Sequence, residues 1–346
     1  MSVQRAIQIQ GAKAAKLVAD APIPPTRPNH IRVRTSHVAL NPTDWRAIDG
    51  GGAPGATSGC DYSGIVEEVG RGADSHGLRV GDRVAGAVHG ANTNFPQSGA
   101  FAEHVVAKPA LAIRVPENVS LAEAATLGVG ITTVALALYR SLQLPWPTAP
   151  TKEPFPVLVY GGSTATGTLA IQYAKLSGCA VLTTCSPRNF ELVRALGADR
   201  VFDYRASGVG AEIREAAGGK LAHVLDCISS PASAAICAEA VGDAGGRYTS
   251  LLPVFNFPRE DVQTEHVIGY TAFGEEVSLG SWRIPARPED LECATRFWKL
   301  TGELLAQGKI RVHRPEVREG GLAGVLDGLD DLRQGRVSGV KLVYKV

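Results

Sequence analysis

No stretch of this sequence reaches the roughly 18 consecutive apolar residues that a membrane-spanning helix requires. The first residues, MSVQRAIQIQGAKAAK, alternate polar and apolar side chains and do not form the apolar core of a signal peptide. The six cysteines are scattered and form no C-x-x-C pair, which is typical of free thiols in a reducing compartment. We therefore expect a cytoplasmic protein.

An excess of charge of either sign is also missing. Lys and Arg total 35 against 34 Asp and Glu, which leaves a formal net charge of +1. A near-neutral chain has no bulk electrostatic attraction to nucleic acid or to an anionic membrane surface. The length of 346 residues and the apolar share of 45% are instead those of a folded protein with two domains.

Two patterns of secondary structure divide the sequence. The first part, to about residue 125, forms short strands separated by Gly, Pro and Asn, which is typical of a barrel. Ser120 and Glu123 then form an S-x-x-E capping box that predicts a helix start, and helical character resumes at 132–142. Strands and helices alternate afterwards, which predicts βαβ units and a parallel sheet. The predicted strands are 157–160, 180–184, 200–202, 223–227 and 246–251.

The predicted fold is α/β, with a barrel-type domain at 1–125 and a doubly wound parallel-sheet domain at 126–280. Residues 281–346 are expected to return to the first domain, with a helix at 288–307 and a final strand at 339–344. Pro253 and Pro258 follow the fifth strand of the sheet. Because proline removes hydrogen-bond donors from a sheet edge, we expect this edge not to pair with a second copy and predict a monomer.

The strongest motif is an apolar strand that runs into a Gly-rich turn, GGSTATG at 161–167, followed by a helix. Small residues let the backbone approach a pyrophosphate, and the N-terminus of the helix offers free N–H groups and a partial positive charge. The spacing departs from a strict G-x-G-x-x-G, so a tight turn without a ligand is the structural alternative.

An acidic residue is missing at the end of the second predicted strand. NAD sites usually place Asp or Glu there to bind the ribose hydroxyls, whereas this sequence has Ser186, Pro187, Arg188 and Asn189. Arg188 and Ser186 suit a 2′-phosphate through charge and hydrogen bonds. We therefore predict NADPH as the cofactor; the structural alternative for Arg188 is a solvated residue at a helix start.

These motifs together resemble the medium-chain dehydrogenase/reductase superfamily over essentially the whole chain. The resemblance is carried by NPTDW at 41–45, GCDYSGIV at 59–66, GDRV at 81–84, GAFAE at 99–103 and the Gly-rich turn. The segments GGSTATG, CSPRN at 185–189 and NPTDW-R are more narrowly similar to fungal trans-acting enoyl reductases, which assist highly reducing polyketide synthases. The resemblance implies a GroES-like catalytic domain and a Rossmann domain that binds NADPH.

The zinc ligands of metal-dependent relatives are missing. Such relatives need thiolate and imidazole ligands, and the matching positions here are Asn41, Cys60 with Asp61, and Val129. Asn and Val cannot replace the thiolates, and Cys60 alone cannot hold a catalytic zinc ion. We therefore predict no metal, which disfavours alcohol dehydrogenation and favours reduction of a carbon–carbon double bond that a carbonyl already activates.

The resemblance implies two catalytic residues, Arg46, where relatives often carry Lys, and the hydroxyl of Thr132; Tyr62 is a third candidate donor. Their structural alternatives are a surface charge, a residue at a helix start and a core aromatic. The implied cofactor contacts are Thr43, Asp44, Trp45, Arg46, Ser163, Thr164, Ala165, Thr166, Ser186, Pro187, Arg188, Asn189, Tyr204, Leu251, Leu252, Val337 and Ser338. The implied substrate contacts are Thr132, Thr133, Leu136, Tyr139, Tyr270, Thr271, Phe273 and Gly274. The structural alternative for the segment 269–274 is an edge strand.

The resulting hypothesis is a trans-acting enoyl reductase in which NADPH gives a hydride to the β-carbon of an unsaturated acyl thioester. The thioester would be a polyketide intermediate on the carrier domain of a highly reducing polyketide synthase, or of its hybrid with a peptide synthetase. Negative charge then develops on the thioester oxygen, and a proton must reach the α-carbon. A stand-alone quinone or enone oxidoreductase and a cofactor-binding sensor without catalysis are the two alternatives.

Overall fold

The computed structural model describes residues 2–50, 52–279 and 282–346, which divide into two compact units. The β-rich unit comprises Met1–Thr132 and Tyr270–Val346, and the parallel-sheet unit comprises Thr133–Gly269. The two compact units meet at 132/133 and 269/270, and the sequence predicts domain boundaries at 125/126 and 280/281. Helix α3 (Gly128–Val134) begins in the β-rich unit, and Tyr270 and Thr271 form hydrogen bonds within that unit.

A seven-stranded sheet is the main element of the β-rich unit, in the order β16-β17-β3-β4-β5-β7, with β6 also paired to β3. The strands are β3 (Ile31–Ala39), β4 (Asp61–Val69), β5 (Arg83–Ala87), β6 (His104–Ala107), β7 (Ala112–Arg114), β16 (Pro315–Arg318) and β17 (Lys341–Lys345). Because β17 pairs antiparallel with β3, the end of the chain completes a sheet that the first third begins.

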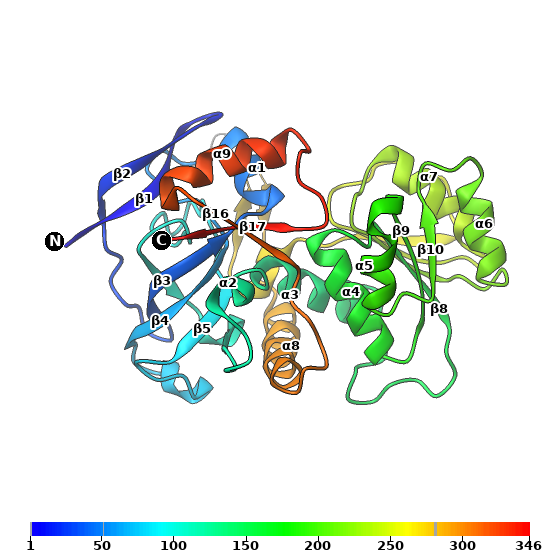
Figure 1. The fold of residues 1–346 in the computed structure, drawn as a ribbon, viewed down its shortest axis with the longest axis horizontal. Helices are drawn as coiled ribbons and strands as arrows, with labels where there is room; N and C mark the ends of the chain where they lie inside the picture. The colour runs from blue at the N-terminus through cyan, green and yellow to red at the C-terminus, as the bar shows by residue number, and fades with distance from the viewer. Residues whose placement is uncertain (1, 51, 280–281) are drawn as a thin grey trace. The chain divides into compact units, whose positions relative to one another are not determined.

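Two hairpins and several helices complete this unit. The hairpins are β1 (Val3–Gly11) with β2 (Ala14–Pro22) and β14 (Val277–Leu279) with β15 (Trp282–Ile284). The helices are α1 (Pro42–Asp49), α2 (Leu121–Ala124), α8 (Pro288–Ala306) and α9 (Gly321–Arg333), with α9 beside α1 (Figure 1). The sequence pattern does not predict α9, because its glycines suggest a turn. Here Gly324 and Gly328 leave room for the side chain of Tyr344: a Cβ atom on Gly324 would lie 2.8 Å from its ring, and one on Gly328 would lie 2.4 Å from its hydroxyl oxygen.

The predicted capping box is confirmed. Ser120 Oγ accepts the Glu123 N–H at 3.2 Å, and a Glu123 carboxylate oxygen accepts the Ser120 N–H at 2.9 Å, at the start of α2. The helix predicted at 132–142 begins earlier, at Gly128, and changes into a π-helical turn at Ala135–Ser141. The helix predicted at 288–307 is α8.

Six parallel strands form the sheet of the parallel-sheet unit, in the order β10-β9-β8-β11-β12-β13. They are β8 (Pro156–Tyr160), β9 (Ala180–Cys185), β10 (Arg200–Asp203), β11 (His223–Asp226), β12 (Gly246–Ser250) and β13 (Val262–His266). The five predicted strands are confirmed to within one residue at each end. The sixth, β13, is missed because three of its five residues, Gln263, Thr264 and Glu265, are polar and exposed.

The edge on this side of the sheet is therefore β13, whereas the sequence argument assigned it to β12. Pro253 and Pro258 lie in the connection between β12 and β13, outside the edge strand. The expectation that these prolines prevent the edge strand from pairing is therefore wrong, and the prediction of a monomer loses this support.

The helices α4 (Ala165–Leu176), α5 (Phe190–Ala195), α6 (Val209–Ala216) and α7 (Pro231–Ala240) cover the sheet. Figure 1 shows α4 and α5 on one side of it and α6 and α7 on the other. Helices on both faces of a parallel sheet make it doubly wound, and the predicted fold class is confirmed. Within the described ranges, no helix combines the length and the apolar character needed to cross a membrane.

Candidate active site

The Gly-rich turn lies where the strand order of the parallel sheet reverses. Strand β8 has β9 on one side and β11 on the other, and doubly wound sheets bind their ligands at the carboxyl ends of the strands at such a point. Gly161 has a φ of +83°, and a Cβ atom on Gly162 would lie 2.0 Å from Thr183 Oγ1. Glycine is therefore required at both positions, because the left-handed backbone of Gly161 and the packing of Gly162 against β9 leave no place for a side chain.

Thr164 is the N-cap of α4. Its hydroxyl accepts the Gly167 N–H at 3.0 Å and donates to the Gly161 carbonyl at 2.8 Å, so it braces the turn from within. Ser163, Ala165 and Thr166, the other predicted cofactor contacts in this turn, are half-buried. The first N–H groups of a 12-residue helix point toward this position, which suits the negative charge of a pyrophosphate.

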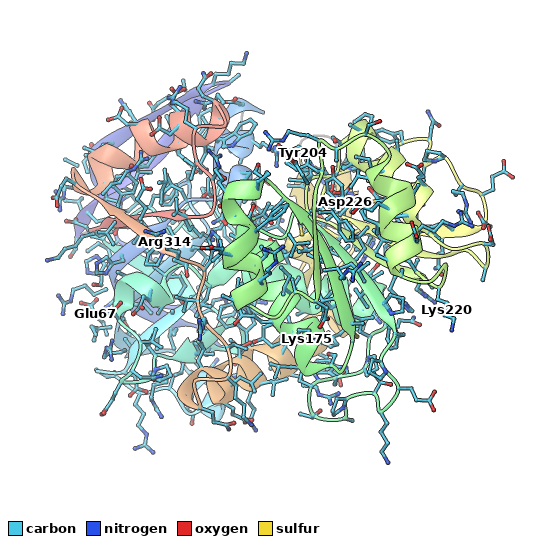
Figure 2. All side chains as sticks on the ribbon, turned by 45° about the vertical axis from the view of Figure 1, so that its right-hand side comes forward. Glu67, Lys175, Tyr204, Lys220, Asp226 and Arg314 are labelled. Carbon is cyan, nitrogen blue, oxygen red and sulfur yellow. The ribbon has the colours of Figure 1, made fainter. Side chains whose placement is uncertain are left out.

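The predicted cofactor residues of this unit follow the carboxyl ends of four strands: β8, β9, β10 and β12. After β9, Pro187 and Arg188 are exposed and Asn189 is buried. Tyr204, after β10, is 39% exposed. Figure 2 shows Tyr204 and Asp226 toward one end of the sheet, and Lys175 and Lys220 toward the other. The predicted nucleotide contacts of this unit thus lie together at the carboxyl ends of the strands.

Sequence reasoning missed the buried carboxylate of Asp226, which lies at the carboxyl end of β11. Its Oδ1 accepts the N–H groups of Ile228 and Ser229 at 2.9 and 2.8 Å, and its Oδ2 accepts the hydroxyls of Ser233 and Tyr248 at 2.6 and 2.8 Å. Ser229 Oγ in turn accepts the N–H of Leu251, a predicted cofactor contact, at 2.8 Å. Asp226 therefore fixes the loop at Ile228 and Ser229, beside the Gly-rich turn, although no local sequence motif predicts this role.

In the β-rich unit, Thr43, Cys60 and His89 come together around Tyr270, which is a predicted substrate contact. Its hydroxyl is 2.8 Å from Thr43 Oγ1 and 3.5 Å from Cys60 Sγ, and its ring stacks on His89 at 3.9 Å between centroids. Tyr270 belongs to a 3-10 turn, Gly269–Phe273, so the alternative of an edge strand is wrong. The turn connects a predicted cofactor contact, Thr43, with a predicted substrate contact.

Helix α1 holds the remaining cofactor predictions near the N-terminus. Asp44 is 1% exposed, and its carboxylate accepts the Asn41 N–H at 2.7 Å; burial and the nearby Asp61 raise the pKa of Asp44 to about 7. Arg46 is exposed, with its guanidinium 5.0 Å from the centroid of the Trp45 ring. Val337 is half-buried and Ser338 exposed, just before β17.

Thr132, the second predicted catalytic residue, is 3% exposed. Its hydroxyl donates to the Gly128 carbonyl at 3.1 Å and accepts the indole N–H of Trp298 at 3.2 Å. A hydroxyl has a single proton to donate, so Thr132 can donate to a substrate only after its bond to Gly128 opens. Trp298 was not singled out from the sequence, because it lies in the middle of α8, 166 residues away.

The other predicted substrate contacts are mostly buried. In the parallel-sheet unit, Thr133, Leu136 and Tyr139 are less than a tenth exposed, and the Tyr139 hydroxyl is 3.0 Å from Ser177 Oγ. In the β-rich unit, Thr271 Oγ1 donates to Asp290 at 2.5 Å. Phe273 is buried, and Gly274 has a φ of +65°. The third candidate donor, Tyr62, lies fully inside the apolar core, and burial raises the pKa of its hydroxyl.

The positions that match zinc ligands do not fit a catalytic zinc ion. Burial raises the pKa of the Cys60 thiol well above its usual range, which keeps it protonated beside Tyr270. The oxygens of Asn41 and Asp61 are bound to the ammonium group of Lys341, at 2.8 and 2.5 Å. Val129 contributes a backbone N–H to Asp61 at 2.7 Å. The two oxygen donors among the matching positions therefore already bind the lysine ammonium group. The other two positions offer only a protonated thiol and an aliphatic side chain.

Comparisons with known proteins agree with this architecture. Residues 27–117 match the alcohol dehydrogenase GroES-like domain, and residues 165–251 match the zinc-binding dehydrogenase family. The trans-enoyl reductase ACTTS2 of Alternaria alternata is 48% identical, with 100% of both chains covered. The trans-enoyl reductase resD of Aspergillus sclerotiorum is 48% identical over 96% of this chain and 97% of the relative. The quinone oxidoreductase of Coxiella burnetii has a TM-score of 0.73 at 24% identity, over 99% of both chains, a likeness of fold alone.

A GroES-like unit together with a doubly wound, six-stranded parallel sheet defines a medium-chain dehydrogenase or reductase. Within this class, the full-length identity of 48% decides the family. The chain belongs to the trans-enoyl reductases, which are oxidoreductases that use a nicotinamide cofactor.

Proposed function

We propose that this trans-enoyl reductase uses NADPH to reduce the unsaturated acyl thioester of a polyketide intermediate. The thioester would be presented by the carrier domain of a highly reducing polyketide synthase or of its hybrid with a peptide synthetase. The observation that carries the proposal is the Gly161–Gly167 turn at the strand reversal, with Arg188 in place of a carboxylate after β9, in a chain 48% identical to trans-enoyl reductases.

The choice of NADPH rests on charge. A 2′-phosphate at the end of β9 would face the exposed guanidinium of Arg188 and the hydroxyl of Ser186, whereas a carboxylate there would repel it. Bound NADPH supplies the hydride for the β-carbon of the substrate. The residues around the turn then have two tasks, which are to bind the pyrophosphate through backbone N–H groups and to hold the cofactor in one orientation.

The second requirement is a donor for the negative charge that develops on the thioester oxygen. Thr132 is the proposed donor, and rotation of its hydroxyl away from Gly128 would release the proton for this bond while Trp298 holds the oxygen. Arg46 keeps its charge at any working pH, so we propose that it anchors an anionic group of cofactor or substrate without transferring a proton. In each unit taken by itself, the remaining predicted substrate contacts stay proposed contacts of the acyl chain.

The test compares substrates and cofactors in one assay. The purified enzyme is given NADPH or NADH with a crotonyl group on a carrier domain, the same group on free pantetheine, or a soluble quinone. We expect the highest kcat/KM with NADPH and the carrier-bound thioester. Comparable turnover of the quinone would favour the stand-alone quinone or enone reductase, and the absence of any hydride transfer would favour the cofactor-binding sensor.

The assembly and location of the chain are part of the same proposal. We propose a monomer that works beside its synthase in the cytoplasm, where the six free cysteines stay reduced. Light scattering of the purified protein gives the mass directly. A mass of twice the chain would contradict the monomer, and with β13 as an edge strand the first place to look for the contact would be that edge.

A further inference from the structure

Lys341 forms a buried ionic cluster in the β-rich unit. Its side chain is 2% exposed, and its Nζ lies 2.5 Å from Asp61 Oδ2, where the carboxylate is 0% exposed. The second partner is Asn41 Oδ1, at 2.8 Å. An ammonium group buried this deeply is tolerated only with a counter-charge and hydrogen bonds in good geometry, and Asp61 and Asn41 supply both.

The cluster continues through the other oxygen of Asp61. Asp61 Oδ1 accepts the backbone N–H of Val129 at 2.7 Å, next to Gly128 at the start of α3. A Cβ atom on Gly128 would lie 2.3 Å from the same oxygen, so the carboxylate and the helix start fit only because residue 128 is glycine. One ammonium group thus joins β17, β4 and the residues that begin α1 and α3.

Three of these partners, Asn41, Asp61 and Val129, are positions at which the family resemblance places metal ligands; the remaining such position, Cys60, precedes Asp61 in the chain. We propose that the Lys341 ammonium takes the place of the metal ion as a fixed internal cation, and that Lys341 is a positioning residue of this reductase. It holds the start of α1, which carries Thr43, and the start of α3, which carries Thr132. The kinetic part of this proposal rests on the proposed function, whereas the stability part does not.

The first test replaces the charge and then returns it. Lys341→Ala removes the side chain beyond Cβ, and propylammonium has the shape and charge of the missing part. We expect Lys341→Ala to lower the melting temperature and to reduce kcat about tenfold or more, because small displacements of positioning groups have effects of that size. Propylammonium should restore both quantities in the variant and leave the wild type unchanged, and propan-1-ol should restore neither.

A second set of variants separates charge from packing. Lys341→Arg keeps the charge and should keep most of kcat, whereas Lys341→Met keeps the length and should lose it. The double variant Asp61→Asn with Lys341→Met removes both charges, so its stability should exceed that of Lys341→Met while its kcat stays low. Lys175→Met is the matched control, because Lys175 pairs with Asp199 at the surface.

The outcomes distinguish this proposal from its competitors. Full kcat in Lys341→Met, or in the double variant, would overturn the positioning role. Stoichiometric zinc in the purified wild type, with activity that a chelator removes, would overturn the replacement of the metal. Rescue of the melting temperature by propylammonium does not depend on the substrate, so it would stand even if the wild type failed to reduce an enoyl thioester.

Discussion

Each of the two units contains a carboxylate with no exposed surface at its candidate site, Asp226 in one and Asp61 in the other, and the two are satisfied in opposite ways. Asp226, in the parallel-sheet unit, accepts four hydrogen bonds from neutral groups, two backbone N–H groups and two hydroxyls. Asp61, in the β-rich unit, is bound by the Lys341 ammonium and one N–H. The first carboxylate depends on its own loop and the neighbouring strand, and the second depends on a residue 280 positions along the chain.

This difference determines how the stability of each unit responds when its carboxylate is substituted. When a carboxylate that is bound by neutral donors is replaced, the groups left without a partner are neutral. Their loss of hydrogen bonds lowers the free energy of unfolding much less than an unpaired buried charge does. A carboxylate held by an ammonium leaves an unpaired buried cation. The β-rich unit should therefore be the more sensitive of the two to a change of one charged residue.

The largest effect is expected for Asp61→Asn. The variant keeps the size of the side chain but leaves the Lys341 ammonium without its counter-charge, which should cost about 3–5 kcal/mol of unfolding free energy. Equilibrium unfolding in urea measures this cost. Glu67→Gln is the control on the same strand, because Glu67 pairs with Arg32 and Arg34 where solvent reaches both partners, and solvent-screened pairs contribute about 0–1 kcal/mol. Equal costs for the two variants would remove the contrast between buried and exposed pairs.

The second prediction concerns acid. Burial lowers the pKa of His89 from 6.5 to about 4, against the weak opposing influence of Glu275. The unfolded chain therefore binds a proton that the folded unit does not, between pH 6.5 and 4, and stability contributed by neutral His89 is lost as the pH falls through this window. The loss should reach about 3 kcal/mol near pH 4. The raised pKa of Asp44 acts in the opposite direction over the same range.

The measurement is consequently a difference between proteins. The free energy of unfolding is followed against pH for the wild type and for His89→Gln, which keeps a polar side chain opposite Asn92. The variant should lose less stability than the wild type between pH 6.5 and 4. His76→Gln is the control, since His76 is exposed. Parallel curves for the wild type and His89→Gln would show that His89 does not carry the acid sensitivity.

The same contrast explains how much the sequence could predict. The predicted nucleotide site at the carboxyl ends of the strands follows from local sequence order, because a strand, a Gly-rich turn and a capped helix are consecutive in the chain. The residues of the Lys341 cluster are not consecutive: Asn41, Asp61 and Lys341 are brought together by the pairing of β17 with β3 and by contacts across 280 or more positions of the chain. The sequence pattern could exclude thiolate ligands at these positions, but it could not indicate what binds the remaining oxygens. Thr132 illustrates the same limit, because its partner Trp298 comes from a distant helix.

The third prediction returns to the parallel-sheet unit. Asp226→Asn replaces one acceptor oxygen by an NH₂ group, so at least one of the four donors loses its acceptor, at a cost of about 1–3 kcal/mol. This cost should be smaller than that of Asp61→Asn in the same urea assay. Asp243→Asn is the control, because Asp243 pairs with Arg214 at the surface. A greater loss for Asp226→Asn than for Asp61→Asn would reverse the ranking of the two units.

The smallest effect is expected for Arg188→Gln, which should leave the fold intact because the side chain is exposed. Loss of a charge-assisted bond to a 2′-phosphate should raise the KM for NADPH about tenfold, equivalent to about 1.4 kcal/mol, and leave the KM for NADH unchanged. Arg200→Gln is the matched control, since Arg200 is also exposed but begins β10, at the opposite end of its strand from the predicted nucleotide site.

Steady-state kinetics with both cofactors gives the answer in one series. Arg188→Lys should fall between the wild type and Arg188→Gln, because an ammonium keeps the charge and loses the bidentate geometry. Equal increases in KM for NADPH and NADH would mean that Arg188 orders the loop after β9 and makes no specific contact with the phosphate. In that case the parallel-sheet unit would still bind a dinucleotide through its Gly-rich turn, but the missing carboxylate after β9 would be the only feature that favours the phosphorylated form.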